Sequence, residues 1–292
     1  MQRDTGKPPA PGPSADDGRP PILARQRQTL IVELIRTEGA VRVSDLVDRL
    51  GVSEMTIRRD LALLHERGLV EKTHGGAAAV DTSSHEPGFR AKSSLMQLEK
   101  AAIARAASEL VRPGTAIALS AGTTTFALAT RLVDVADLTV VTNSIPVADA
   151  FHARGRHDQV VILTGGLRTP SDALVGPIAV DAIRSLHVDI VFLGVHGMYR
   201  RGFTTPNLLE AETDRALIEA GRKLVVLADS SKWGVIGISS IAPLDRAETV
   251  ITDSGLARDA REELSIMVAV QAVEAYSALE PAGSGSADGP RK

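Results

Sequence analysis

The sequence predicts a two-part α/β protein: an N-terminal winged helix-turn-helix, followed by a larger, mostly parallel α/β domain. Three observations support this prediction. A glycine turn joins two amphipathic helical segments near residue 50, a strand-turn-strand segment follows them, and from Glu99 short apolar runs alternate with helical patterns. With 292 residues, 43% of them hydrophobic, the chain is long enough for one small domain and one of ordinary size.

The composition excludes several classes of protein. The chain has no cysteine, which rules out disulfides and thiolate metal sites and makes a cytoplasmic protein the simplest interpretation. No run approaches the roughly 20 apolar residues of a membrane helix and no secretory signal opens the chain, so no membrane partner is expected. The net charge of −3 argues against a generally basic coat. Any DNA binding must therefore rest on a local patch and be sensitive to salt.

The chain begins with a segment that cannot form a core. Residues 1–21 are rich in proline, glycine and charge, which predicts a disordered arm. An inert tail is favoured here over an arm that enters the minor groove. A supporting helix is then expected over residues 24–37, because four apolar residues recur with helical spacing: Leu30, Ile31, Leu34 and Ile35.

Two short helices separated by a turn are predicted next. Ser44 is expected to cap the first, residues 45–50. Gly51 lies in the short turn that a helix-turn-helix requires. Ser53 is a good N-cap for the second helix, and Gly68 is expected to end it, because glycine adopts the left-handed conformation at low cost.

The second helix has two contrasting faces. Its apolar residues recur at i, i+4 and i+7 and should point into a small core: Ile57, Leu61 and Leu64. At about 100° per residue, Met55, Thr56 and Arg59 fall on the opposite face, with Arg58 on its flank. A helix that buries one side and presents hydroxyl and guanidinium groups on the other suits a major groove.

Residues 69–77 predict a strand, a glycine turn and a return strand, which together form a wing. The candidate DNA-contacting residues are Ser53, Thr56, Arg58 and Arg59 on the helix and Lys72, Thr73 and His74 on the wing. The alternative is a plain three-helix bundle without nucleic acid. The joint presence of turn, paired arginines and wing argues against it, so residues 22–80 are predicted to bind double-stranded operator DNA.

The rest of the chain predicts a linker, an α/β domain and a tail. Residues 81–98 are mostly polar and predict the linker, and residues 280–292 a disordered tail. Within residues 99–279, apolar strands alternate with helices, which indicates a parallel sheet covered on both faces. The expected strands are residues 115–120, 138–142, 160–163, 188–193, 224–228 and 250–252, and the expected helices include residues 98–111, 123–132, 176–186 and 207–220 and one begun by Pro146.

Five of these strands end in polar or glycine-rich turns. They are Gly122-Thr123-Thr124, Thr142-Asn143-Ser144, Thr164-Gly165-Gly166, Gly194-Val195-His196-Gly197 and Asp229-Ser230-Ser231-Lys232. Ligands bind beyond the carboxyl ends of such strands. Glycines let the backbone approach an anion, amides at a helix start donate to it, and a lysine adds charge. The turns predict a pocket for a small phosphorylated polyol or sugar, although Thr123 or Asn143 taken singly is equally explained as a satisfied cap.

Several of these segments resemble the DeoR family of bacterial transcription regulators. The N-terminal resemblance lies in Arg25-Gln26-Arg27, in residues 52–61, and in residues 68–70 running into 73–77. A second set resembles the family's effector domain, whose fold is similar to ribose-5-phosphate isomerase. Its segments are residues 122–125, 142–144, 165–166, 202–205 with Glu210-Ala211, and 229–232.

The resemblance implies a domain that senses a sugar phosphate and controls oligomeric DNA binding. The protein would then be a regulator of carbohydrate metabolism genes, most often a repressor in this family, and a homo-oligomer (dimer or tetramer). Carried over by position, the pocket candidates are Thr123, Thr124, Asn143, Gly166, Glu210 and Lys232, and the strand ends add Ser120, Gly122, Gly165 and His196. No cofactor, metal ion or catalytic residue is expected.

Two departures from the family pattern bear on the chemistry. The family usually has an acidic residue where this chain has Ser120, and an aspartate where it has His196. Isomerases need carboxylates to move a proton next to a carbonyl. The departures therefore argue against the rival prediction, an isomerase-like enzyme with an appended DNA-binding head. Glu210 and Lys232, which could still serve such an enzyme, keep that prediction open. His196 either contacts the ligand or is a hydrogen-bonded turn histidine, and a regulator that binds DNA without any ligand is a third possibility.

Overall fold

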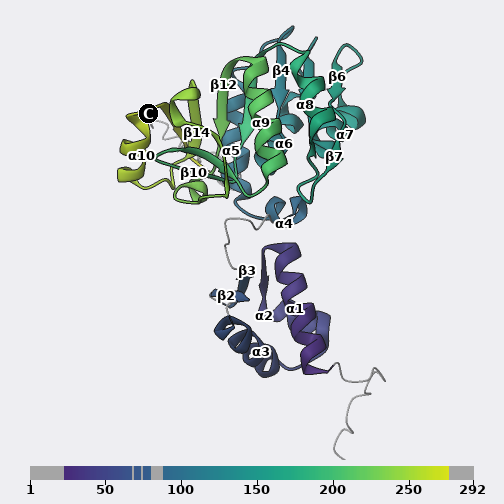
Figure 1. Ribbon diagram of the computed structural model, residues 1–292, viewed down its shortest axis with the longest axis vertical. Helices are drawn as coiled ribbons and strands as arrows, with labels where there is room; N and C mark the ends of the chain where they lie inside the picture. The colour runs from purple at the N-terminus through teal and green to yellow at the C-terminus, as the bar shows by residue number, and fades with distance from the viewer. Residues whose placement is uncertain (1–22, 68, 74, 80–87, 276–292) are drawn as a thin grey trace, which may run out of the picture.

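The computed structural model describes residues 23–275, except 68, 74 and 80–87. The predicted arm and tail, Gly68 and His74 lie outside the described residues. Figure 1 shows two parts, which we name the N-terminal unit (residues 23–79) and the α/β unit (residues 88–275). No helix within the described part of the chain is long and apolar enough to cross a membrane.

The N-terminal unit has the predicted winged helix-turn-helix. Its elements in chain order are α1 (Ala24–Glu38), β1 (Ala40–Arg42), α2 (Val43–Leu50), α3 (Glu54–Glu66), β2 (Val70–Thr73) and β3 (Gly76–Ala79). The wing strands β2 and β3 pair antiparallel, and β1 pairs with β3 on the other side. Gly51 adopts the left-handed conformation in the turn between α2 and α3, with φ of 64°.

The starts of α2 and α3 differ in how well the sequence predicted them. Ser53 caps α3, because its Oγ accepts the Thr56 amide at 3.3 Å. The prediction that Ser44 caps α2 is wrong, since the helix begins at Val43 after an extended Arg42. The cause is tertiary: Arg42 pairs with Gly76 of the wing, and the Val43 amide donates to the Gly75 carbonyl at 2.9 Å. The wing therefore fixes the chain at the point where α2 starts.

A buried ion pair ties α1 to α3. Arg27 Nε lies 2.6 Å from Asp60 Oδ2, and the two side chains are only 11% and 7% exposed. Gln28 Nε2 donates to the other carboxylate oxygen at 2.9 Å. The pair lies beside the apolar core of this unit, where Ile31, Ile35 and Ile57 are fully buried. It fixes the orientation of α3 against α1.

The α/β unit is built on a seven-stranded, wholly parallel sheet. The strand order is β15-β14-β12-β9-β4-β5-β6, so all these strands end at the same edge of the sheet. Their bounds are β4 (Ala116–Leu119), β5 (Thr139–Thr142), β6 (Val160–Leu163), β9 (Val188–Gly194), β12 (Gly221–Leu227), β14 (Thr249–Asp253) and β15 (Ala269–Val273). The sequence predicted six of them and missed β15.

Both faces of the sheet are covered, as the apolar strands predicted. Along β4, Ile117 and Leu119 pack on one face with α5 (Gln97–Ser108), α6 (Thr123–Leu132) and α7 (Ile145–Arg154). Ala118 packs on the other face with a second group of elements. That group comprises α8 (Pro177–Arg184), α9 (Leu208–Ala220), α10 (Arg258–Ser265) and a small antiparallel sheet of β10 (Gly197–Tyr199), β11 (Gly202–Thr205) and β13 (Ser239–Ala242).

Strand β6 departs from the prediction that the sheet is covered on both faces. It is the outermost strand of the sheet, and Val160, Val161 and Leu163 are 55%, 36% and 43% exposed. Beyond it lies a short hairpin of β7 (Leu167–Arg168) and β8 (Leu174–Val175). A run of apolar residues gives the same sequence signal at an edge as at the centre of a sheet, so position in the sheet decided the exposure.

We expect Asp60→Ala to lower the free energy of unfolding of the N-terminal unit by about 3 kcal/mol, because it leaves the buried Arg27 guanidinium without its carboxylate. Hydrogen exchange of the α1 and α3 amides in the full chain measures this change. Asp48→Ala, which removes an exposed carboxylate from α2, is the matched control. Equal exchange in the two variants would show that the Arg27–Asp60 pair contributes nothing to this unit.

Candidate functional site

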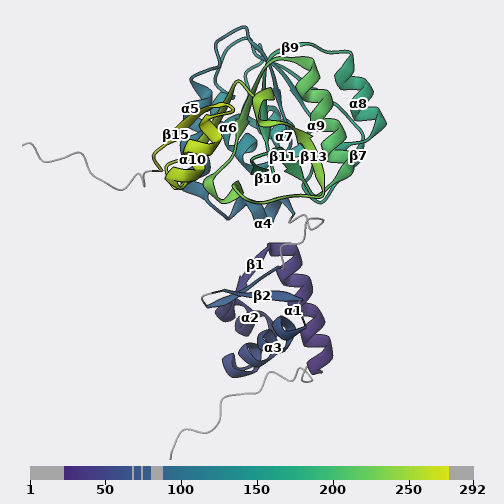
Figure 2. The same cartoon turned by 60° about the vertical axis from the view of Figure 1, so that its left-hand side comes forward.

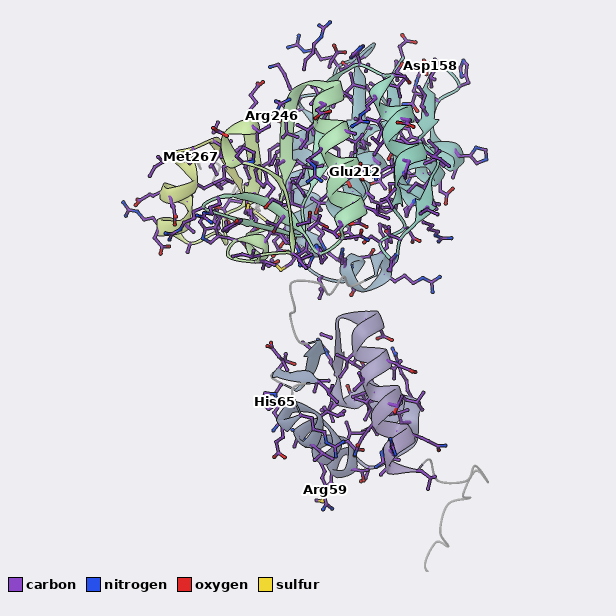
Figure 3. The ribbon with its side chains drawn as sticks, in the orientation of Figure 1. Arg59, His65, Asp158, Glu212, Arg246 and Met267 are labelled. Carbon is purple, nitrogen blue, oxygen red and sulfur yellow. The ribbon has the colours of Figure 1, made fainter. Side chains whose placement is uncertain are left out.

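The exposed face of α3 carries the side chains that the sequence assigned to it. Met55 is 81% exposed, Arg59 is exposed and Thr56 is half-buried. Figure 3 shows Arg59 pointing outward at the end of the N-terminal unit that lies farthest from the α/β unit. Arg58 is also exposed, but it is paired one turn back along the helix with Glu54, with Nη2 2.6 Å from Oε1. The outer end of α3 can therefore enter a groove without obstruction from the α/β unit.

The wing completes this surface. Arg58, Lys72 and Thr73 line one hollow between α3 and the wing, together with the backbone of Gly75 and Gly76. Lys72 and Thr73 are exposed on β2. Two cationic side chains and a hydroxyl thus flank the polar face of α3, which is the arrangement that phosphate contacts beside a groove require. His74, the remaining wing candidate, lies outside the described residues.

A second hollow lies at the carboxyl edge of the parallel sheet. Seven of the ten predicted pocket residues line it: Gly122, Thr123, Thr124, Asn143, His196, Glu210 and Lys232. They come from the turns after β4, β5, β9 and β12 and from the first turn of α9. The shared strand direction is what brings residues more than 100 positions apart in the chain into one pocket.

Asn143 fixes the position of two backbone segments next to this pocket. Its Oδ1 accepts the Ala121 amide at 2.9 Å, just before α6, and its Nδ2 donates to the Leu174 carbonyl of β8 at 3.2 Å. The side chain is buried, and both ends of its amide are bonded to the backbone. Asn143 therefore positions the turn that presents Gly122, Thr123 and Thr124 at the start of α6.

The pocket combines cationic and anionic side chains. Lys232 lies in a short 3-10 helix, Ser230–Lys232, which Asp229 caps by accepting the Ser231 amide at 3.2 Å. Glu210, which lines the same pocket, accepts from the hydroxyls of Thr169 at 2.7 Å and Thr205 at 3.4 Å. A lysine and helix-start amides suit an anionic group, whereas carboxylates suit hydroxyl donors.

Three predicted residues do not line this pocket: Ser120, Gly165 and Gly166. Ser120 is fully buried, and its Oγ accepts the Gly194 amide at 2.9 Å, so it joins β4 to β9. Gly166 has φ of 118°, and a Cβ there would lie 2.5 Å from the Val175 carbonyl oxygen. Gly165, with φ of 73°, faces Ile178 of α8. The turn after the edge strand β6 thus packs on β8 and α8 instead of facing the centre of the sheet edge.

The sequence missed part of the lining. The additional polar or aromatic residues are Phe89, Lys92, Ser171, Thr205 and Asp214. Asp214 lies four residues after Glu210 on α9, and residues with this spacing share one face of a helix. The sequence could therefore have placed Asp214 beside Glu210 in the pocket. Phe89 and Lys92 belong to a helix, α4 (Phe89–Ser93), in the segment predicted to be linker. A helix of five residues is too short to show a periodic pattern.

Arg168, a loop arginine just past Gly166, is paired with Asp172 at the surface, with Nη2 2.6 Å from Oδ1. It is not among the residues that line the pocket. Within the described part of the chain, no group of three or more histidine, aspartate or glutamate side chains is arranged to hold a metal ion.

Comparison with known proteins assigns both units to one family. A model of the DeoR-like helix-turn-helix domain matches residues 27–83, and a model of the DeoR C-terminal sensor domain matches residues 96–254. The chain is 36% identical over 254 residues to the uncharacterized HTH-type transcriptional regulator YgbI of Escherichia coli (strain K12), covering 85% of this chain and 99% of that relative. It is 32% identical over 233 residues to the transcriptional repressor AccR of Agrobacterium fabrum, covering 79% and 90%.

Among solved structures, D-ribose-5-phosphate isomerase in complex with phospho-erythronic acid aligns with a TM-score of 0.35 and 14% identity, covering 47% of this chain and 53% of that chain. This likeness is weak, and the assignment rests on the sequence matches, which extend over both units. The chain therefore belongs to the DeoR family of transcriptional regulators, not to the enzymes that were the rival prediction.

Proposed function

We propose that this DeoR-family regulator represses carbohydrate metabolism genes, and that a phosphorylated sugar bound in the α/β unit sets its affinity for operator DNA. The observation that supports this most is the pocket at the sheet edge, which Lys232, the start of α6 and Glu210 line together. One chain thus joins an exposed DNA-reading helix to a site for a small anionic, hydroxyl-rich molecule. We place the DNA-binding domain at residues 22–80, the effector domain at residues 99–279, and the protein in the cytoplasm, beside the DNA it binds.

On the DNA side, we assign base contacts to the exposed face of α3 and phosphate contacts to the wing. Thr56 and Arg59 lie where a helix in the major groove meets base edges, and Ser53 lies at its N-terminal end. Arg58 and Lys72 lie on the two sides of the hollow beside that face. The formal charge of the whole chain is −3, so attraction to DNA has to come from this local cluster.

On the effector side, we assign the anionic group to the start of α6 and to Lys232. The free amides and the dipole at a helix start favour a phosphate, and the lysine adds a point charge. Glu210 and Asp214 line the same pocket and accept hydrogen bonds from sugar hydroxyls. A ligand that favours one arrangement of the two DNA-binding domains shifts the population toward it and so changes operator affinity.

We further propose that the protein is a homo-oligomer that associates through the β6 edge. An exposed, apolar edge strand is an open template for pairing with another chain. The apolar residues around it are Val160, Val161, Leu163, Leu167 and Ile178, all at least 36% exposed. Association of two copies through this edge would place two DNA-binding domains in one particle, as a two-fold operator requires.

A thermal-shift screen of sugar phosphates tests the pocket. At a concentration of about 100 times its dissociation constant, a ligand of the native state adds about 2.7 kcal/mol of stability, which raises the melting temperature of a domain of this size by roughly 5–11 °C. We expect at least one phosphate ester to raise the melting temperature, its free sugar not to do so, and Lys232→Met to abolish the shift. A panel on which no ester shifts the wild-type protein would remove the sugar phosphate from the proposal.

Arg59→Ala tests the reading helix. We expect a loss of about 1–3 kcal/mol in binding to a selected operator and little loss on a scrambled duplex, because a bidentate contact to guanine is specific for sequence. Mobility-shift titrations at several salt concentrations separate this result from a phosphate contact, which would weaken both duplexes equally and reduce the salt slope. Unchanged binding to both duplexes would place Arg59 outside the interface.

Leu163→Lys tests the edge strand. Placing a charge on the exposed edge should dissociate the oligomer into smaller species, which light scattering coupled to size-exclusion chromatography measures directly. Ile266→Lys is the matched control, because Ile266 is also apolar and 81% exposed but follows α10 on another part of the unit. An unchanged mass for Leu163→Lys, or an equal change in both variants, would rule out the β6 edge.

A further inference from the structure

The pocket wall includes the first described element after the N-terminal unit. Helix α4 (Phe89–Ser93) is separated from the wing strand β3 only by residues 80–87, and its Phe89 and Lys92 line the pocket. Figures 1 and 2 both show α4 between the two units. The segment that leads out of the DNA-binding domain is therefore also a wall of the ligand site.

Helix α4 contacts the other pocket walls through Phe89 and Lys92. The Phe89 ring meets the Phe126 ring of α6 edge-on, with centroids 5.6 Å apart, and the Phe89 amide donates to the Pro170 carbonyl at 3.3 Å. Lys92 Nζ donates to Ser171 Oγ at 3.4 Å, which is long for a hydrogen bond. A five-residue helix has little stability of its own. The position of α4 thus depends on its contacts with neighbouring elements.

A buried lysine links α4 to the strand end that carries Lys232. Lys100 is 6% exposed, and its Nζ donates to the carbonyls of Lys92 and Leu95, each at 2.6 Å, at the C-terminal end of α4. Burial lowers the pKa of Lys100 to about 8. Asp229 opposes the shift, and the positive charges of Lys232 and Lys92 add to it. The ammonium groups of Lys92 and Lys232 therefore both repel that of Lys100, and an anion bound near them would relieve that repulsion.

The outer side of α4 faces the N-terminal unit. Helix α4 contacts α1, and Arg90 and Leu95 line a hollow together with Glu38 and Asp45 of that unit. A displacement of α4 at the pocket therefore moves a surface that the DNA-binding domain touches.

We propose that α4 is a movable wall of the effector pocket, in which Lys92 joins Lys232 in contacting the anionic group of the ligand, so that binding repositions the segment leading to the DNA-binding domain. This proposal rests on the proposed function, because it assigns a further contact and a route of regulation to the same site. Lys92 is then a residue that determines affinity for the anion, although it lies outside the parallel sheet.

Inorganic phosphate is the probe, because it presents the anion without assuming a sugar. Trp233, the only tryptophan of the chain, follows Lys232 directly and reports binding by its fluorescence in the full-length protein. We expect Lys92→Met to weaken phosphate binding about tenfold or more, because it removes a charge-assisted hydrogen bond to the anion. Lys92→Arg should retain most of the affinity, because it keeps the positive charge and the donor. Lys223→Met is the matched control, because Lys223 is an exposed lysine of the same unit, paired with Glu248.

The movement of α4 is measured separately. The chain has no cysteine, so Arg90→Cys carries one environment-sensitive dye on the exposed side of α4, and Ala153→Cys on α7 is the control position. Saturating phosphate should change the emission at position 90 and leave position 153 unchanged.

Three outcomes distinguish this proposal from the function on which it rests. Equal phosphate affinity in wild type and Lys92→Met, with loss in Lys232→Met, would overturn the Lys92 contact and leave the pocket intact. A signal from Trp233 without a change in the dye at position 90 would overturn the movement of α4. A wild-type protein that binds no phosphate would overturn the proposed anion contact, and the sugar-phosphate screen would then decide separately whether the pocket has a ligand.

Discussion

The common direction of the seven sheet strands is the constraint on which the effector site depends. Because all of them end at one edge, the turns after β4, β5, β9 and β12 meet there although they are far apart in the sequence. The short polar residues at those turns could not form a pocket in an antiparallel sheet, where neighbouring strands end at opposite edges. The parallel order in turn requires helices on both faces, and the two apolar clusters provide that cover.

The sequence predicted the features that depend on local periodicity and composition. The face of α3 that carries Arg59 and the apolar strands of the sheet follow from spacing alone. Asn143 and Lys232 were found because strand ends in a parallel sheet share one edge. Once the DeoR resemblance is added, the pocket is predicted in outline.

What the sequence did not predict depends on tertiary contacts. Ser44 is a good capping residue, but pairing of Arg42 with the wing starts α2 one residue before it. Gly165 and Gly166 look like an anion-binding turn, but their strand is at the edge and they pack on β8 and α8. Helix α4 exists because Phe89, Lys92 and Lys100 hold it in place, and none of these contacts is visible in a segment of five residues.

The hydrogen bonds of Asn143 separate the part of the pocket that keeps its shape from the part that recognises a ligand. The oxygen and the nitrogen of the Asn143 side chain both form hydrogen bonds with backbone groups of neighbouring segments. The geometry of the α6 start therefore does not depend on which molecule is bound. Side chains that line the cavity, such as His196 and Asp214, can then be exchanged during evolution without disturbing that frame. A scaffold of this kind lets related regulators diverge in the metabolite they sense while their architecture stays the same.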